Sequence, residues 1–300
     1  MEKNAFRYPD FFHIGAYKSA STSLHYYLSQ HPQICMAREK GGNYLAFAGK
    51  NPADDREFGQ NIIRESDYRA LFADYNGEPV IGESSPHYLV STRACERIRQ
   101  VRPDARLVVI LRNPVEAIYS RYLMRCRSGT IDIPFRDVMD REEAILATGK
   151  GKSRLQLGTA FYARWLGEYF QRFPPEQISV QLYEDYLHHR DAQLSDLFTF
   201  LGVDSGFVPQ NLRHYNRSGI PRQPWLRGLM RQRSRLQPLA RRVLPSRARA
   251  YVMDRLSDRL ERPGLPDHER RRLVSIYRED ILLLETLLRR DLQHWLEAPS

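Results

Sequence analysis

Apolar runs bounded by turn residues mark the strands that this sequence predicts. The clearest run covers residues 106–111 (RLVVIL) and lies between Pro103 and Pro114. A run of β-branched residues and leucines of this kind is typical of a parallel strand covered on both faces. Shorter apolar or alternating segments occur at residues 11–15, 34–36, 80–83 and 178–183.

Helical periodicity follows several of these segments. Apolar positions after the first strand recur at helical spacing, which predicts a helix from about Thr22 to His31, and Pro32 then ends it. The dipeptide Asn113-Pro114 combines a good N-cap with a good first helical residue and predicts another helix start. The other predicted helices cover residues 66–73, 91–101, 134–148, 158–173, 191–201 and the chain from about 267.

Strands that alternate with helices predict an α/β fold, with a central, mostly parallel sheet, flanking helices and right-handed crossovers. The last part of the chain holds no convincing strand, so we expect a helical C-terminal appendage. We find no repeat and no low-complexity linker, and 300 residues are enough for one large α/β domain. We therefore predict a single domain over residues 1–300, with a core at about 8–225 and a helical extension at about 226–300.

The turn between the first strand and the first helix, residues 16–21 (AYKSAS), holds small residues, hydroxyls and one lysine. A strand that feeds such a turn into a helix N-terminus forms an anion site, because N–H groups and the helix dipole favour negative charge. In the register of a nucleotide P-loop, Ser21 takes the lysine position and Thr22 the hydroxyl position, while Lys18 lies inside the loop. This argues against ATP-driven phosphoryl transfer and suits another anionic donor. A plain strand–turn–helix with a surface lysine is the alternative.

A second pair of polar residues follows the 106–111 strand. Arg112 comes directly after the strand, and Ser120 lies off the apolar stripe of the next helix. Ligands of parallel sheets bind at the carboxyl ends of strands, where segments 16–22 and 112–120 are both expected. Arg112 and Ser120 are therefore free to face a common ligand.

Composition narrows the class of protein. The chain is 42% hydrophobic and 27% charged, which is ordinary for a soluble globular protein. Much of the net charge of +10 comes from residues 222–249, which hold nine arginines and no acid. A basic segment can bind nucleic acid, lipid or an anionic ligand. This one lacks interleaved aromatics apart from Trp225, so a solvated face or an acceptor-docking surface is favoured over a nucleic-acid reader.

Cysteine content and hydropathy bear on the compartment. Cys35, Cys95 and Cys126 show neither metal-ligand spacing nor an even disulfide framework. No apolar run approaches the ~20 residues of a membrane span, and the N-terminal residues lack the apolar core of a signal peptide. We therefore expect a cytoplasmic protein with reduced thiols. The sequence leaves the oligomeric state open.

Two motifs stand in order along the chain: the loop Lys18-Ser19-Ala20-Ser21-Thr22-Ser23, and Arg112-Asn113-Pro114 with Ser120. Together they resemble the sulfotransferases that use 3′-phosphoadenosine-5′-phosphosulfate (PAPS) as donor. The segment Asn216-Arg217-Ser218-Gly219 resembles the late loop that closes over the nucleotide in that family. The ordered match covers about residues 10–225, and the C-terminal helix resembles the family's tail. The resemblance implies a P-loop-like fold.

The resemblance also implies roles. The loop of residues 18–23 grips the 5′-phosphosulfate, and Arg112 with Ser120 binds the 3′-phosphate. Arg217, Ser218 and Gly219 belong to the loop that closes over the nucleotide. During sulfuryl transfer, charge builds on the bridging oxygen of the leaving phosphate, and Lys18 is the candidate that stabilises it. No metal is expected, since the donor has no β- and γ-phosphates to bridge.

The acceptor needs a base, and the sequence offers two candidates. Glu39 is favoured, because it begins a segment similar to the Lys-Glu-x-x-Tyr/Phe segment of related enzymes, although the aromatic residue arrives later, at Tyr44. His87 is the rival. It lies just past a strand end, and the ordinary pKa of a histidine lies near working pH.

Three functions remain open. A PAPS-dependent sulfotransferase acting on a hydroxyl or amine is favoured. A P-loop kinase of small molecules is disfavoured by Ser21 at the lysine position, and a nucleic-acid-binding protein is favoured least. The acceptor stays open between a small molecule and a carbohydrate or glycopeptide. Ser85 stands where many carbohydrate-acting relatives carry a lysine, so Lys18 or an arginine from elsewhere would have to compensate.

Overall fold

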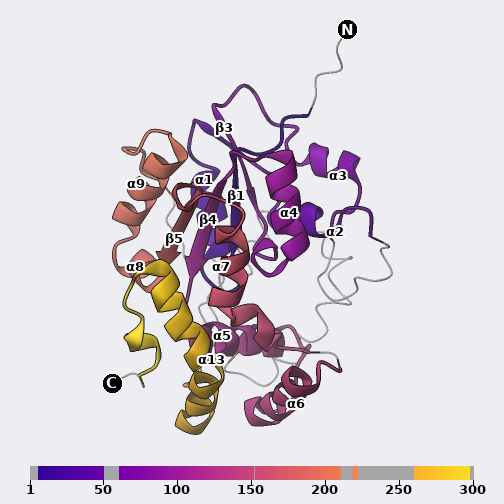
Figure 1. The fold of residues 1–300 in the computed structure, drawn as a ribbon, viewed down its shortest axis with the longest axis vertical. Helices are drawn as coiled ribbons and strands as arrows, with labels where there is room; N and C mark the ends of the chain where they lie inside the picture. Colours follow the sequence, from indigo (N-terminus) through magenta and orange to yellow (C-terminus); the bar gives the residue numbers. More distant parts are fainter. Residues whose placement is uncertain (1–5, 51–60, 152, 211–218, 222–259, 298–300) are drawn as a thin grey trace. The chain divides into compact units, whose positions relative to one another are not determined.

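The computed structural model describes residues 6–50, 61–151, 153–210, 219–221 and 260–297 (Figure 1). The chain forms two compact units. The first consists of Met1–Asn113, Tyr162–Arg213 and Thr286–Arg289, and the second of Pro114–Phe161, His214–Glu285 and Arg290–Ser300. The organisation of the whole chain as one domain stays a prediction.

The first unit is built on a five-stranded sheet in which all neighbouring strands are parallel (Figure 1). The strand order is β2-β3-β1-β4-β5, so β1 lies in the middle, between β3 and β4. The strands are β1 Phe11–Gly15, β2 Ile34–Met36, β3 Val80–Ser84, β4 Arg106–Leu111 and β5 Ile178–Leu182. They coincide closely with the apolar runs of the sequence, which confirms the predicted α/β fold.

Helices cover this sheet on one face through a continuous apolar cluster. Helices α1 (Ser21–Leu28) and α9 (Arg190–Leu201) contribute their apolar stripes to it, and Phe11, Val108 and Ile110 contribute from the strands. All three strand residues belong to the buried core. Burying a side chain of this size stabilises the fold by roughly 1.5–3 kcal/mol, so the central strands are firmly held.

On the opposite face, Phe12 packs near Tyr88, with ring centroids 6.3 Å apart. Helices α4 (Thr92–Val101) and α7 (Tyr162–Phe170) belong to this layer. The hydroxyl of Tyr169 on α7 donates to the carbonyl oxygen of Tyr88 at 2.6 Å. The segment after β3 is thereby tied to the covering helices, which fixes the position of the residues just before it.

The helix after β1 is shorter than the apolar spacing predicts. It ends at Leu28, so His31 lies beyond it. The ring of His31 packs against Phe198 and Phe207 with centroid distances of 4.7 Å, and its Nε2 donates to the carbonyl oxygen of Asp204 at 3.0 Å. His31 therefore continues the helical spacing because tertiary packing buries it, not because the helix extends that far.

The short helices of the first unit differ most from the prediction. The helix predicted at 66–73 is α3, Glu65–Ala70. Two further helices, α2 (Tyr44–Phe47) and α8 (Tyr183–His188), were not predicted, because so few residues carry no readable helical period. The long helix predicted at 158–173 is α7 alone, preceded by a 3₁₀ turn at Leu157–Ala160.

The second unit is mainly helical. Its helices confirm the predicted segments and are α5 Pro114–Arg127, α6 Phe135–Thr148 and α13 Asp267–Leu288. Helix α13 is the predicted C-terminal helix. A two-stranded antiparallel ladder, β6 (Ile220–Pro221) with β7 (Leu260–Glu261), is an addition that we did not expect, because two-residue strands leave no pattern in the sequence.

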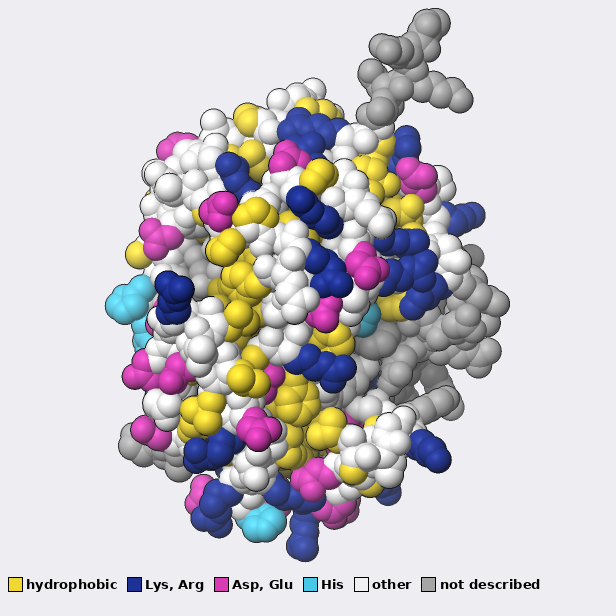
Figure 2. Space-filling model, in the orientation of Figure 1, with side chains coloured by type: hydrophobic (Ala, Val, Ile, Leu, Met, Phe, Trp, Pro, Cys, Tyr) yellow, Lys and Arg dark blue, Asp and Glu magenta, His cyan; other side chains and the backbone are white. Residues whose placement is uncertain are grey.

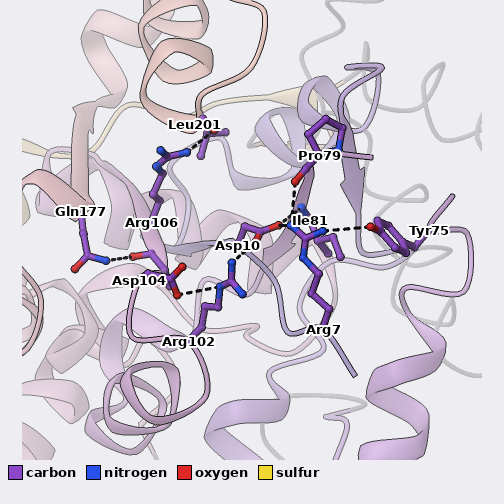
Figure 3. Close-up of polar contacts among 11 residues, drawn as sticks. Arg7, Asp10, Tyr75, Pro79, Ile81, Arg102, Asp104, Arg106, Gln177 and Leu201 are labelled. Carbon is purple, nitrogen blue, oxygen red and sulfur yellow. Dashed lines mark hydrogen bonds and ion pairs between the residues drawn. The ribbon is translucent and has the colours of Figure 1, made fainter. Parts of the chain in front are cut away.

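A polar cluster ties the strands together at their amino ends (Figure 3). The carboxylate of Asp10, just before β1, accepts hydrogen bonds from Arg7 Nη2 at 2.7 Å and Arg102 Nη2 at 2.5 Å. It also accepts from the backbone N–H of Ile81 at 2.8 Å. Because this cluster lies at the start of the strands, it stabilises the sheet at the edge opposite to the loops that follow β1, β3 and β4.

Candidate active site at the carboxyl ends of the strands

The loops that follow β3, β1 and β4 leave the sheet at one edge, because these three strands are adjacent and parallel. The backbone N–H of Ala16 donates to the carbonyl oxygen of Ile110 at 2.8 Å, and that of Ser85 donates to the carbonyl oxygen of His13 at 3.0 Å. These bonds lock the start of each loop to the neighbouring strand. The expected anion loop therefore begins from a fixed point.

The loop after β1 has the backbone of an anion cradle. Lys18 and Ala20 have φ values of 65° and 58°, in the left-handed region that non-glycine residues rarely adopt. Ala20 is the N-cap of α1, and its methyl group cannot accept a hydrogen bond from the first helical turn. No acidic residue lies in that turn. The helix start is thus suited to an external anion.

The side chain of Ser19 points to the same conclusion. It is fully buried, and its hydroxyl oxygen has no hydrogen-bond partner within the described part of the chain. A buried hydroxyl without a partner costs free energy, roughly 1–3 kcal/mol. A bound anion would supply the missing acceptor, so Ser19 fits the predicted role in donor binding.

Arg112 joins the second predicted motif to this loop. Its Nη1 donates to the carbonyl oxygen of Lys18 at 3.1 Å, and its guanidinium carbon lies 4.6 Å from the centroid of the Tyr183 ring. The residue is only 7% exposed. The adjacent backbone N–H of Asn113 donates to Glu184 Oε1 at 3.1 Å. Packing thus holds a cation directly beside the loop, which brings the two sequence motifs together.

The remaining predicted nucleotide residues belong to the second unit or lie outside the described residues. Ser120 is fully buried in α5, which belongs to the second unit. Gly219 is buried in the same unit. Arg217, Ser218 and the arginine-rich segment 222–249 lie outside the described residues. Their predicted roles stay predictions.

The two candidate bases have different surroundings. His87 Nδ1 and the hydroxyl of Tyr17, a loop residue, are 2.8 Å apart, and the His87 ring stacks on Phe47 with a centroid distance of 5.0 Å. Glu39 is exposed, and its carboxylate forms no hydrogen bond or ion pair with any residue that the structure describes. The imidazole of His87, unlike Glu39, is therefore held against the anion loop.

Sequence reasoning missed one cation at this site. Lys40 lies in the loop after β2, and its Nζ donates to Ser21 Oγ, at the start of α1, at 3.2 Å. Burial lowers the pKa of Lys40. In the sequence it is one of three consecutive charged residues, 38–40, and no local pattern marks it as a ligand. The single signal in the sequence was the missing lysine at position 21.

Sequence reasoning also missed a buried carboxylate behind the loops. Glu83 accepts hydrogen bonds from Ser85 Oγ at 2.6 Å and from the hydroxyls of Tyr68 and Tyr88 at 2.7 Å each. Burial raises the pKa of Glu83. Ser85 Oγ accepts in turn from the backbone N–H of Asn43 at 3.1 Å. The Ser85 hydroxyl is therefore used to fix the loop that carries Lys40.

No group of three or more His, Cys, Asp or Glu side chains is placed to hold a metal ion within the described ranges. None of the helices in those ranges has the length and apolar character needed to cross a membrane.

A parallel sheet with a loop, a helix start and buried cations at its carboxyl edge is an arrangement in which α/β proteins commonly bind anionic ligands. The chain belongs to the Sulfotransferase family, whose family model matches residues 9–207. A solved sulfotransferase from Alicyclobacillus acidocaldarius is 26% identical with a TM-score of 0.72, and the match covers 97% of this chain and 100% of that one.

Curated relatives agree in family but are longer. The membrane-associated sulfotransferase kil1 of Dictyostelium discoideum is 27% identical over 146 residues, which are 47% of this chain and 29% of that protein. Heparan sulfate glucosamine 3-O-sulfotransferase 3A1 of Homo sapiens is 23% identical over 222 residues, which are 74% of this chain and 51% of that protein. The chain thus spans about half or less of the length of these relatives.

Proposed function

We propose that this chain transfers a sulfuryl group from PAPS to a hydroxyl or amine of an acceptor. The hydrogen bond from Arg112 to the carbonyl oxygen of Lys18 carries this proposal, because it joins a buried cation to the loop after β1 at one edge of the sheet. Membership of the Sulfotransferase family supports it. The donor carries a phosphate or phosphosulfate at each end of its ribose, so it needs two such anion sites.

In the proposed reaction, the acceptor oxygen or nitrogen attacks sulfur in line with the bond to the leaving group. The bond between sulfur and the bridging oxygen breaks, and its electron pair stays on the 5′-phosphate of the leaving 3′-phosphoadenosine-5′-phosphate (PAP). The acceptor proton passes to a base. Lys18 and the loop N–H groups stabilise the growing charge on the bridging oxygen, a contribution of roughly 10²–10³ in rate for one such donor.

For the base, the geometry supports His87 more than Glu39. His87 is in contact with the loop through Tyr17, and its ring is oriented by the stack on Phe47. A base must lie within hydrogen-bond reach of the proton that it takes, which favours a side chain fixed beside the donor loop. Glu39, which the sequence favoured, is exposed in the free protein and would have to turn toward the acceptor.

For the acceptor, we propose a carbohydrate hydroxyl. Glycopeptides and small molecules are the alternative acceptor classes. The support is the acceptor named for the human relative, a heparan sulfate glucosamine 3-O-sulfotransferase. The cytoplasmic location expected from the sequence also stays a proposal.

The donor assignment is tested by thermal unfolding with PAP, ATP and duplex DNA at equal concentrations. A ligand that binds only the native state stabilises it by roughly 2.7 kcal/mol at a hundred times its Kd. We expect PAP to raise Tm clearly and ATP much less, because Ser21 stands where a P-loop lysine would reach the γ-phosphate. Equal shifts from PAP and ATP would overturn the assignment. A shift from DNA alone would favour the nucleic-acid alternative.

A further inference from the structure

The first helical position of the anion loop holds a serine where a P-loop holds its lysine. The structure places an ammonium there from another loop: Lys40 Nζ donates to Ser21 Oγ at 3.2 Å, across 19 positions of sequence. The N–H of Gly41, the next residue, donates to the carbonyl oxygen of Ser84 at 2.8 Å. The segment that carries Lys40 is therefore fixed to the strand end beside the loop.

Among the residues that the structure describes, the charge of Lys40 has no anionic partner. In the described ranges, no carboxylate forms an ion pair with it, although ion pairs are common elsewhere in the chain. The two histidines that interact electrostatically with Lys40 carry no negative charge that could balance its ammonium. Burial, together with the charge of Lys40, lowers the pKa of His25 to about 4 and that of His13 to about 3. Both rings are neutral at pH 7 and lie in the field of an unbalanced cation.

A second observation at the same place indicates an anionic ligand. The hydroxyl of Ser19 is fully buried without a hydrogen-bond partner among the described residues, one position before the N-cap Ala20 of α1. An unpaired hydroxyl, a helix start that no side chain caps and an unbalanced ammonium together form a site for a tetrahedral oxyanion.

We propose that Lys40 binds the 5′ end of the donor and takes the place of the P-loop lysine that this chain lacks. The proposal rests on the proposed function, and it adds a residue that contacts the donor. When the bond between sulfur and the bridging oxygen breaks, the electron pair remains on the leaving phosphate. Lys40 keeps its proton and stabilises that charge as an ion pair.

A purely structural role makes the opposite prediction for stability. A desolvated ammonium with one hydroxyl partner costs free energy in the folded state, and an apolar side chain of similar length removes that cost. Lys40→Met should therefore leave the Tm of the unliganded protein unchanged or higher. If the hydrogen bond to Ser21 mattered mainly for folding, the same substitution would lower Tm.

The test compares wild type, Lys40→Met and the matched control Lys50→Met. Lys50 is exposed and lies 4.9 Å from the centroid of the Phe47 ring. Calorimetry measures the Kd of PAP, and thermal unfolding measures Tm without ligand. We expect Lys40→Met to raise the Kd roughly 10- to 100-fold, the effect of losing one charge-assisted hydrogen bond, with Tm unchanged or higher. Lys50→Met should bind PAP as the wild type does.

The outcomes separate the two proposals. If the wild type binds PAP and Lys40→Met binds it equally well, the role of Lys40 is wrong and the proposed function stands. A loss of PAP binding that is matched by a fall in Tm also overturns the role, because Lys40 then acts through folding. If the wild type itself binds no PAP, the proposed function fails, and the role of Lys40 fails with it.

Discussion

Acidification should destabilise this protein through two histidines, the fully buried His13 and the half-buried His25. The ring of His13 is fully buried: its Nε2 donates to the carbonyl oxygen of Gly15 at 3.0 Å, and its Nδ1 accepts from the Ser84 hydroxyl at 2.7 Å. Burial, which is the larger cause, and the charge of Lys40 together lower the pKa of His13 to about 3. The same two causes lower the pKa of His25 to about 4.

The magnitude follows from proton linkage. Unfolded histidine has a pKa of about 6.5, so the unfolded state binds more protons than the folded state between that value and the lowered values. Stability is therefore present at neutral pH and is lost as pH falls through this window. Integration from pH 7 to pH 5 gives a loss of about 2 kcal/mol for each ring, or about 4 kcal/mol for both. The free energy of unfolding of a native protein is roughly 5–15 kcal/mol in total, so this loss is a large part of it.

The measurement is urea unfolding of the unliganded protein at pH 7, 6 and 5, for the wild type and for His25→Gln. Since His25 contributes about half of the effect, the variant should lose about 2 kcal/mol less than the wild type over this range. Ring NMR signals of the folded wild type should show no titration of His13 above pH 5. A free energy of unfolding that does not change from pH 7 to pH 5, or a His13 ring that titrates near pH 6.5, would refute the reasoning.

Two further predictions concern the residues at the strand ends. Arg112→Ala should weaken PAP binding by about 2–5 kcal/mol, because the bound 3′-phosphate loses a buried cationic partner, whereas Ser120→Ala should cost about 1–2 kcal/mol. Calorimetry with PAP and with adenosine 5′-monophosphate checks this, and an equal loss for both nucleotides would show that Arg112 does not read the 3′-phosphate. For the base, His87→Asn should lower kcat by ~10²–10⁴ with PAP binding nearly intact, and Glu39→Gln should be mild. Labelled-donor assays over acceptor classes measure both, and the reverse pattern would return the role to Glu39.

Surface charge is a poor guide to the site, as the exposed faces show. Lysine, arginine and acidic side chains are interspersed over much of the face seen in Figure 2. The two cations proposed for the candidate site differ from these by burial: Arg112 is only 7% exposed, and the pKa of Lys40 is lowered by burial. Burying an unpaired charge costs free energy, so a buried cation indicates a ligand-binding role more strongly than an exposed cation does.

The sequence alone determined the elements whose signal is local. The strands at 11–15 and 106–111 are mostly apolar. Such runs are typical of parallel strands in a sheet that helices cover on both faces. The loop at 16–21 and Arg112 follow those strands directly. Because parallel strands end at the same edge of a sheet, the sequence predicted that the loop and Arg112 lie close together. Short helices such as α2 and α8 were not predicted, because four to six residues are too few to show a helical period of apolar positions.

Only the tertiary structure decided which side chains complete the site. Lys40 and Ser21 are 19 positions apart, and Tyr17 and His87 are 70 apart, yet each pair is in hydrogen-bond contact. No local pattern encodes such a pair, because its geometry depends on strand order, on register and on how Glu83 fixes the neighbouring loops. The cation missing from the loop at position 21 was visible in the sequence. Its replacement became visible only once the β2 and β1 loops were brought to the same edge of the sheet.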